Sequence, residues 1–201
     1  MYNPKHYKVE DLEKQLEFIR RYPLGTLITN ADNSLQTSYL PFFVEQKNDE
    51  LYLLAHLARS NPQWKVLTSQ KSLISFRGPD CYISPTLYKT SPQVPTWNYT
   101  AIECSGEAEL VNDVTGLDAL MKSSVDFFEK RNNTSWSYDL PEKFKFGLLK
   151  AIVGVRFKIT QIDAKFKLSQ NRESEDYQAV KDFLQTSTAP FASEMLYWFL
   201  K

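Results

Sequence analysis

The strongest constraint on the fold is a series of short segments rich in β-branched and aromatic residues, separated by turn residues. Several of them alternate apolar and polar side chains, which is typical of half-buried strands. No regular alternation of strands with helices accompanies them, which argues against a parallel sheet. The sequence therefore predicts an α+β protein with an antiparallel, six-stranded β-barrel and flanking helices. The six predicted strands are residues 25–29, 35–45, 51–58, 72–76, 99–111 and 152–162.

Single proline and glycine residues and short turn sequences predict where these strands are interrupted or end. Pro41 interrupts the second strand, which predicts an edge position or a bulge, because proline has no N–H for the ladder. Gly78 and Pro79 predict the end of the fourth strand. Turns are expected at residues 31–34 and 47–50.

Helices are predicted between and after the strands. Residues 9–21 and 113–131 carry apolar side chains at helical spacing. Asn61 is expected to cap a short helix over 62–68, with Pro62 in its first turn. A further helix is expected to end near Leu149. We expect a helix over about 174–185 and an apolar tail, so that residues 174–201 pack on the barrel or on a partner subunit.

The length and charge of the chain limit its domain number and the partners that it can attract. At 201 residues the chain fits a single domain, residues 1–201. Twenty-four basic and twenty-four acidic residues give a formal charge of zero, so no global field attracts nucleic acid or an anionic membrane. No signal peptide and no apolar run long enough for a membrane span is visible, which predicts a cytoplasmic protein without membrane contact.

The inventory of reactive residues is small. Cys81 and Cys104 form no CxxC or Cys/His grouping, and we expect both to be buried. The two histidines, His6 and His56, exclude a histidine-rich metal centre. No GxGxxG, P-loop or GxSxG motif is present, and no nucleophile stands beside a base. No catalytic residue is predicted, and any chemistry would come from a cofactor.

Residues 81–100 form the most distinctive stretch, with three prolines, three tyrosines and a Trp-Asn pair. Aromatic faces can cover a planar ring, and amide and hydroxyl groups can bind its polar edge. We expect one wall of a ligand site from Tyr82, Ser84 and Pro85, and the other from Trp97 and Asn98. The alternative is that the aromatic residues belong to the core or to a dimer interface.

Two further groups could bind an anion. His56, Arg59, Ser60 and Asn61 lie where a predicted strand meets a helix, and a guanidinium, a hydroxyl and helix N-terminal amides are the parts of a phosphate site. The alternative is that Asn61 only caps the helix and Arg59 is solvated. Residues 165–171 add lysines and amides after the last strand, a weaker signal because such strand ends are commonly exposed.

Several segments together resemble the PaiB-type family of FMN-binding negative transcriptional regulators, which is related to the pyridoxamine-phosphate-oxidase-like split barrels. They run in order along nearly the whole chain: YNPKHY, HLARSNPQW, FRGPDCYISP, VPTWNY, AIVG and KFKLSQNR.

This resemblance implies a split-barrel homodimer with FMN in clefts between the subunits. It assigns the phosphate to His56, Arg59, Ser60 and Asn61. It places the isoalloxazine against Trp97 and Asn98 and against Lys167 and Gln170 of the partner subunit. The KFKLSQNR segment differs in spacing from the C-terminal motif of the vitamin-oxidising members, which argues against pyridoxamine phosphate oxidation.

Three functions remain open. The resemblance implies a negative regulator of transcription, and the balanced charge predicts that any regulation is indirect rather than by direct DNA binding. A flavin-dependent oxidoreductase, or a haem- or flavin-handling protein, could use the same cleft. A structural dimer that has lost its cofactor is the third possibility.

Overall fold

A computed structural model describes residues 1–31 and 34–201. These residues form the predicted α+β fold, with a large antiparallel sheet of the split-barrel type. The strand order is β3-β2-β6-β7-β8-β5-β4, and β1 pairs with β8. The strands are β1 (Lys8–Val9), β2 (Leu24–Ala31), β3 (Ser34–Pro41), β4 (Phe43–Lys47), β5 (Glu50–Ala58), β6 (Ser72–Ile83), β7 (Thr96–Val111) and β8 (Ile152–Lys167).

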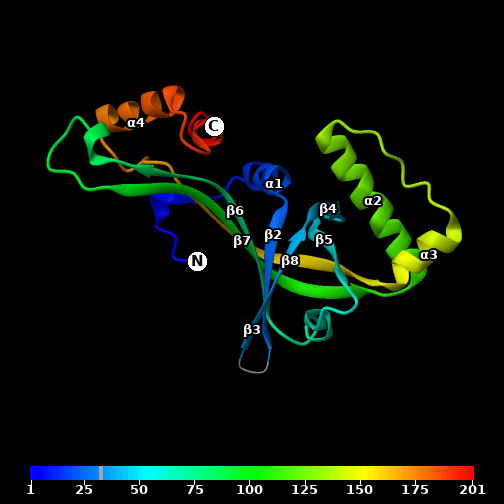
Figure 1. The fold of residues 1–201 in the computed structure, drawn as a ribbon. Helices are drawn as coiled ribbons and strands as arrows, with labels where there is room; N and C mark the ends of the chain where they lie inside the picture. Colours follow the sequence, from blue (N-terminus) through cyan, green and yellow to red (C-terminus); the bar gives the residue numbers. More distant parts are fainter. Residues whose placement is uncertain (32–33) are drawn as a thin grey trace. The chain divides into compact units, whose positions relative to one another are not determined.

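Along the chain, the helices come between and after these strands, as the colours of Figure 1 show. They are α1 (Leu12–Arg21), α2 (Val114–Asn132), α3 (Glu142–Lys150), α4 (Ser174–Thr186) and α5 (Ala192–Phe199), with 3₁₀ helices η1 (Lys5–Tyr7), η2 (Pro62–Lys65) and η3 (Pro85–Leu87). No helix in the described part of the chain is long and apolar enough to cross a membrane.

The described residues contain eight strands where six were expected, for two reasons. The short strand β1 adds one. The second predicted strand is divided at Phe42, whose N–H donates to the Pro23 carbonyl at 2.8 Å and whose ring is fully buried, 5.8 Å from that of Phe76. Pro41 ends β3, which is an edge strand, as predicted. The turn predicted over 31–34 includes residues 32–33, which lie outside the described residues.

The prediction that Gly78 and Pro79 end the fourth strand is wrong, because β6 continues to Ile83. The register with β2 ends at Ser75, so Pro79 lies beyond the residues that need an N–H for that ladder. A Cβ on Gly78 would lie 2.6 Å from the Phe18 ring. The glycine therefore allows a helix side chain to approach the strand closely.

The residues cluster into two compact units. Unit 1 comprises residues 1–18, 77–103 and 163–201, and unit 2 comprises residues 19–76 and 104–162. Strands β6, β7 and β8 contribute residues to both.

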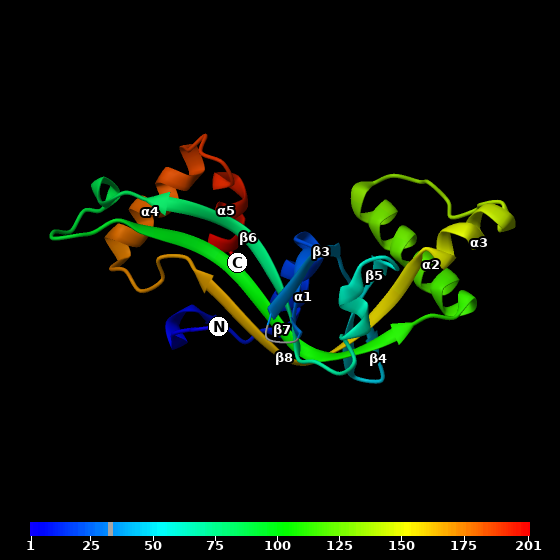
Figure 2. The same ribbon diagram turned by 60° about the horizontal axis from the view of Figure 1, so that its bottom comes forward.

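Aromatic rings form the core of unit 1. The Phe18 ring lies 5.1 Å from that of Phe166 and 5.5 Å from that of Trp198, between ring centroids. Trp198 belongs to α5, which lies beside α4 (Figure 2). The end of the chain, expected as an apolar tail, is thus a helix, because Met195, Trp198 and Phe199 all find buried positions on one side of it.

Unit 2 has a core between α2 and the strands β4 and β5. Phe43, Tyr52 and Leu54 cluster there with Leu120 of α2. The side chain of Asp113 caps α2 by accepting the Gly116 N–H at 2.8 Å. Cys81 of unit 1 and Cys104 of unit 2 are both buried, as predicted.

Candidate ligand-binding site

Arg59 follows β5 in unit 2, and its guanidinium is bound to the protein itself. It donates to the carbonyl oxygens of Lys150 at 2.9 Å and Ile152 at 2.7 Å, and to the Asn112 side chain at 3.4 Å. These bonds satisfy carbonyls at the end of α3 and the start of β8, where a positive charge also suits the helix dipole. Arg59 therefore has a structural role here, and its predicted contact with phosphate would require some of these bonds to be exchanged.

Asn61 caps η2 as predicted, because its side-chain oxygen accepts the Gln63 N–H at 3.0 Å. Its amide donates to Ser38 at 2.8 Å, so the side chain ties the turn to β3. Ser60 is exposed in the turn. Because η2 has only four residues and Asn61 already accepts from its N-terminus, the amides predicted for phosphate binding are not available as a set.

Gln63, which is not among the predicted site residues, is 1% exposed. Its amide donates to Thr29 at 3.1 Å and to the Leu27 and Gln36 carbonyls at 3.2 Å, and its oxygen accepts from Ser38 at 2.6 Å. A buried amide with four partners fixes a loop firmly. Its signal in the sequence was only a polar residue one position after a helix-starting proline.

His56 lies on the face of β5 that α2 covers. It stands opposite Gly154 in the ladder with β8, and opposite residues of an antiparallel pair share a face. A Cβ at Gly154 would meet Leu120 and Val111 at 3.0 Å. Burial lowers the pKa of His56, which favours the neutral imidazole.

In unit 1, Tyr82 and Trp97 form an exposed aromatic pair. Their ring centroids are 5.9 Å apart with an interplanar angle of 68°. Tyr82 is 49% exposed and Trp97 53% exposed, so both present large apolar surfaces to solvent. The prediction that the two ends of the 81–100 stretch lie next to each other is confirmed. An edge-to-face pair of this kind can accept a planar ring against one of its faces.

Trp97 and Asn98 do not form one wall. Asn98 is 0% exposed, and its amide donates to the Ser169 hydroxyl at 2.9 Å. Successive residues of a strand point to opposite faces, so the side chain after an exposed Trp97 must point inward. The expectation that both side chains contact the same ligand ring is corrected accordingly, and Asn98 anchors the turn after β8.

Lys167 lies beside the aromatic pair. Its ammonium donates to the Trp97 carbonyl at 2.7 Å and to the Thr96 hydroxyl. Burial is the largest influence that lowers the pKa of Lys167, and the charges of Arg172 and Lys165 lower it further. Lys167, one of the predicted site residues, thus lies beside Trp97 of its own chain.

The remaining predicted residues make local contacts. Gln170 accepts the Leu168 N–H and donates to the Phe166 carbonyl, which closes the end of β8. Ser84 caps η3 by accepting the Thr86 N–H at 3.3 Å, and Pro85 occupies the first turn. These contacts explain Gln170, Ser84 and Pro85 as structural residues, and their predicted contacts with a cofactor stay predictions.

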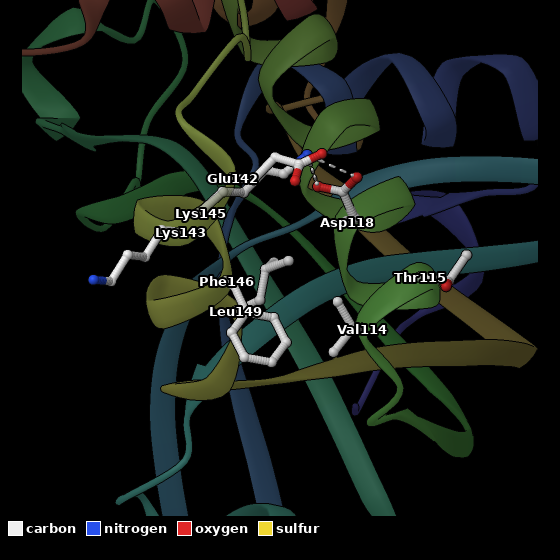
Figure 3. Close-up of a pocket in the computed structure, with 8 residues that line it drawn as sticks. All are labelled: Val114, Thr115, Asp118, Glu142, Lys143, Lys145, Phe146 and Leu149. Carbon is white, nitrogen blue, oxygen red and sulfur yellow. Dashed lines mark hydrogen bonds and ion pairs between the residues drawn. The ribbon is translucent and has the colours of Figure 1, made fainter.

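A cavity of about 560 Å³ lies between α2 and α3 in unit 2 (Figure 3). Val114, Phe146 and Leu149 line its apolar part, and the Lys145 ammonium forms an ion pair with Asp118 at 3.1 Å. The charged groups at its rim therefore neutralise each other in part. No predicted site residue lines it.

Comparison with known proteins identifies the family. A family model described as "Putative FMN-binding domain" matches residues 1–161. A Bacillus subtilis protein named "Protease synthase and sporulation protein PAI 2" is 34% identical over 197 residues, which cover 97% of this chain and 94% of that protein. The chain belongs to this FMN-binding domain family.

Solved structures share the fold of this family member. The flavocytochrome Anf3 of Azotobacter vinelandii aligns with a TM-score of 0.60 and 16% identity, over 86% of this chain and 75% of that chain. The FAD and haem binding protein of Mycobacterium smegmatis aligns with a TM-score of 0.57 and 14% identity, over 86% of this chain and 79% of that chain. At these identities the likeness shows the fold.

The residues of unit 1 fit the flavin that the family description implies. Tyr82 and Trp97 offer exposed aromatic surface for the ring system, and the Lys167 ammonium lies against the backbone of Trp97. A cation beside an aromatic face suits a ring that carries negative charge when reduced. Unit 2 fits the phosphate less well, because Arg59 donates to the protein's own carbonyls.

Proposed function

We propose that the chain binds FMN with the isoalloxazine on the Tyr82–Trp97 pair, and that it acts as a negative regulator of transcription without contacting DNA itself. The single observation that supports the flavin proposal is the exposure of both rings, 49% and 53%, in a member of an FMN-binding family. Two exposed rings side by side offer a flat apolar surface that a planar ligand ring can cover.

The chain's own residues would bind and orient the cofactor. Tyr82 and Trp97 contact the ring, and Lys167 holds a positive charge beside it, while the buried Asn98 fixes the strand that presents Trp97. Bound flavin supplies one- or two-electron transfer. We further propose a homodimer in which the FMN lies in a cleft between the two copies. Light scattering on the purified protein measures this, and a monomeric mass would contradict it.

Trp97→Ala tests the ring contact. We expect at least a tenfold loss of FMN affinity, measured by quenching of flavin fluorescence, because one wall of the site is removed. Trp136→Ala is a matched control: Trp136 is 52% exposed and pairs edge-to-face with Tyr138 at 6.4 Å. Equal FMN affinity in both folded variants would remove the Tyr82–Trp97 pair from the site.

The regulatory part rests on the relative whose name associates it with protease synthesis and sporulation. The zero net charge supports an indirect route, through a metabolite, a partner protein or the redox state of the flavin. A gel-shift titration with promoter DNA tests this. Salt-sensitive binding that scrambled DNA of equal length does not show would overturn the indirect route.

A flavin-dependent oxidoreductase is the second candidate. The exposed aromatic face supports it, because a ring held there stays open to a small reductant, and two proteins of the same fold are named for flavin and haem. The test is the visible spectrum of the FMN-loaded protein. Bleaching by a nicotinamide donor and recovery in air supports the enzyme, whereas a spectrum that no donor bleaches argues against it.

A further inference from the structure

Three cations gather at the end of β8 in unit 1. Lys165 and Lys167 belong to the strand, and Arg172 follows it after a tight turn. Ser169 makes that turn with a left-handed φ of 62°, and the Arg172 N–H donates to its carbonyl at 2.9 Å. The charges of Arg172 and Lys165 both lower the pKa of Lys167, after the larger effect of burial, so both cations lie close enough to act on Lys167.

The positive charge of this cluster is not neutralised by ion pairs. In residues 1–31 and 34–201, no carboxylate forms an ion pair with Lys165, Lys167 or Arg172. Lys165 is 7% exposed, and its ammonium donates to the Tyr2 carbonyl at 3.0 Å and faces the Tyr99 ring at 5.3 Å. Buried and half-buried cations are costly without an anion, so the arrangement favours one.

The carboxylate of Asp176 already accepts four hydrogen bonds. It accepts from the N–H groups of Lys89 at 2.6 Å and Thr90 at 3.1 Å, from the Thr90 hydroxyl at 2.6 Å and from the Gln93 amide at 3.2 Å. One terminal nitrogen of Arg172 donates to the Gln93 oxygen, and the charge of Arg172 also acts on Asp176. The other donors of the guanidinium have no partner among the described residues.

A second observation points to a ligand. Tyr88 is 8% exposed, its ring lies 4.5 Å below the Arg172 guanidinium, and its buried hydroxyl has no hydrogen-bond partner among the described residues. A buried hydroxyl without a partner is costly, and a bound oxygen atom would satisfy it. Guanidinium groups bind oxyanions through paired N–H donors, and stacking on an aromatic ring holds them in place.

We propose that Lys167 and Arg172, with the hydroxyl of Tyr88, form an oxyanion site that takes the phosphate or carboxylate group of a small ligand. Lys165, two residues before Lys167 and on the same face of β8, adds positive charge. The site differs from the predicted phosphate cluster at Arg59, whose guanidinium already binds carbonyl oxygens.

A titration of the FMN-free protein with inorganic phosphate tests the site, by calorimetry at constant ionic strength. We expect one phosphate per chain and at least tenfold weaker binding in Lys167→Gln and in Arg172→Gln. Arg172→Lys should fall between these variants and the natural chain, because a lysine keeps the charge but loses the paired N–H donors and the stacking on Tyr88. Lys122→Gln is the matched control, because it removes the same charge from an exposed position on α2. Thermal melting verifies that each variant is folded.

Two further titrations identify the source of the anion. If the site holds the phosphate of FMN, FMN displaces inorganic phosphate and riboflavin does not. If it holds a separate anionic ligand, phosphate still binds to FMN-saturated protein. Absence of phosphate binding, or binding that neither Lys167→Gln nor Arg172→Gln weakens, would overturn the site. Failure of flavin binding would contradict the proposed function alone, because the phosphate titration does not use flavin.

Discussion

Arg59 and Arg172 have similar sequence surroundings, since each stands among amides and hydroxyls after a strand. In the structure they differ in how many of their hydrogen-bond donors the protein itself occupies. Arg59 in unit 2 donates to two main-chain carbonyls and one side-chain oxygen. Arg172 in unit 1 lies on the Tyr88 ring and donates to a single amide oxygen. The difference teaches that available hydrogen-bond donors, rather than residue type, distinguish an anion site from a structural anchor.

The largest change in stability is expected at Gln63, which fixes the turn that carries Arg59. Gln63→Ala removes four hydrogen bonds and leaves a cavity, which we expect to lower the free energy of unfolding by about 3 kcal/mol. Urea denaturation measures it. Gln70→Ala, at an exposed position five residues beyond η2, is the control and should change stability by less than about 0.5 kcal/mol. Similar midpoints for the two variants would contradict the structural role of the turn.

Replacing either arginine is expected to change the free energy of unfolding by less. We expect Arg59→Ala to lower the free energy of unfolding by about 1–2 kcal/mol, because carbonyl oxygens of Lys150 and Ile152 lose their donors near solvent. Arg172→Ala should cost under about 1 kcal/mol, since it relieves repulsion with Lys167. Denaturation of both variants in one buffer makes the comparison. The contrast fails if Arg172→Ala is the more destabilising change.

The smallest effect is a pH dependence in unit 2. The folded state holds the pKa of His56 below its value in the unfolded chain, because α2 covers that face of β5. The unfolded state therefore binds the proton more readily, and stability is fully present above the ordinary histidine pKa of about 6.5 and is lost as the pH falls toward the folded pKa. Melting temperatures from pH 8 to 5 measure this.

A His56→Gln variant should lose part of that dependence, by no more than about 1.4 kcal/mol per pH unit for a single proton. Identical pH profiles for the variant and the natural chain would show that His56 does not cause it.

The strands and helix caps could be predicted because their causes are local. A nearly continuous apolar run placed the strand over 51–58, and alternation placed the strand over 99–111, each within a few residues, and Asn61 caps η2 as expected. The break predicted at Gly78 failed because the register with β2 and the packing of Phe18 decide it, and both join residues distant in sequence.

The candidate site was predictable only in part, for the same reason. That Tyr82 and Trp97 meet follows from the pairing of their strands, and the prediction was confirmed. Strand alternation predicts that Trp97 and Asn98 point to opposite faces. It does not predict which face is buried, because the buried partner of Asn98 is Ser169, 71 residues away. The carbonyls bound by Arg59 come from residues about 90 positions away, which no local pattern indicates.

The alternation of Trp97 and Asn98 has a consequence for the adaptability of the molecule. The exposed residue and its buried neighbour are one peptide unit apart, yet one faces solvent and the other locks the turn after β8. Changes at position 97 can therefore alter ligand preference at little cost to folding, whereas changes at position 98 are restricted by the core. A directed-evolution library limited to positions 82 and 97 would vary recognition while the scaffold stays constant.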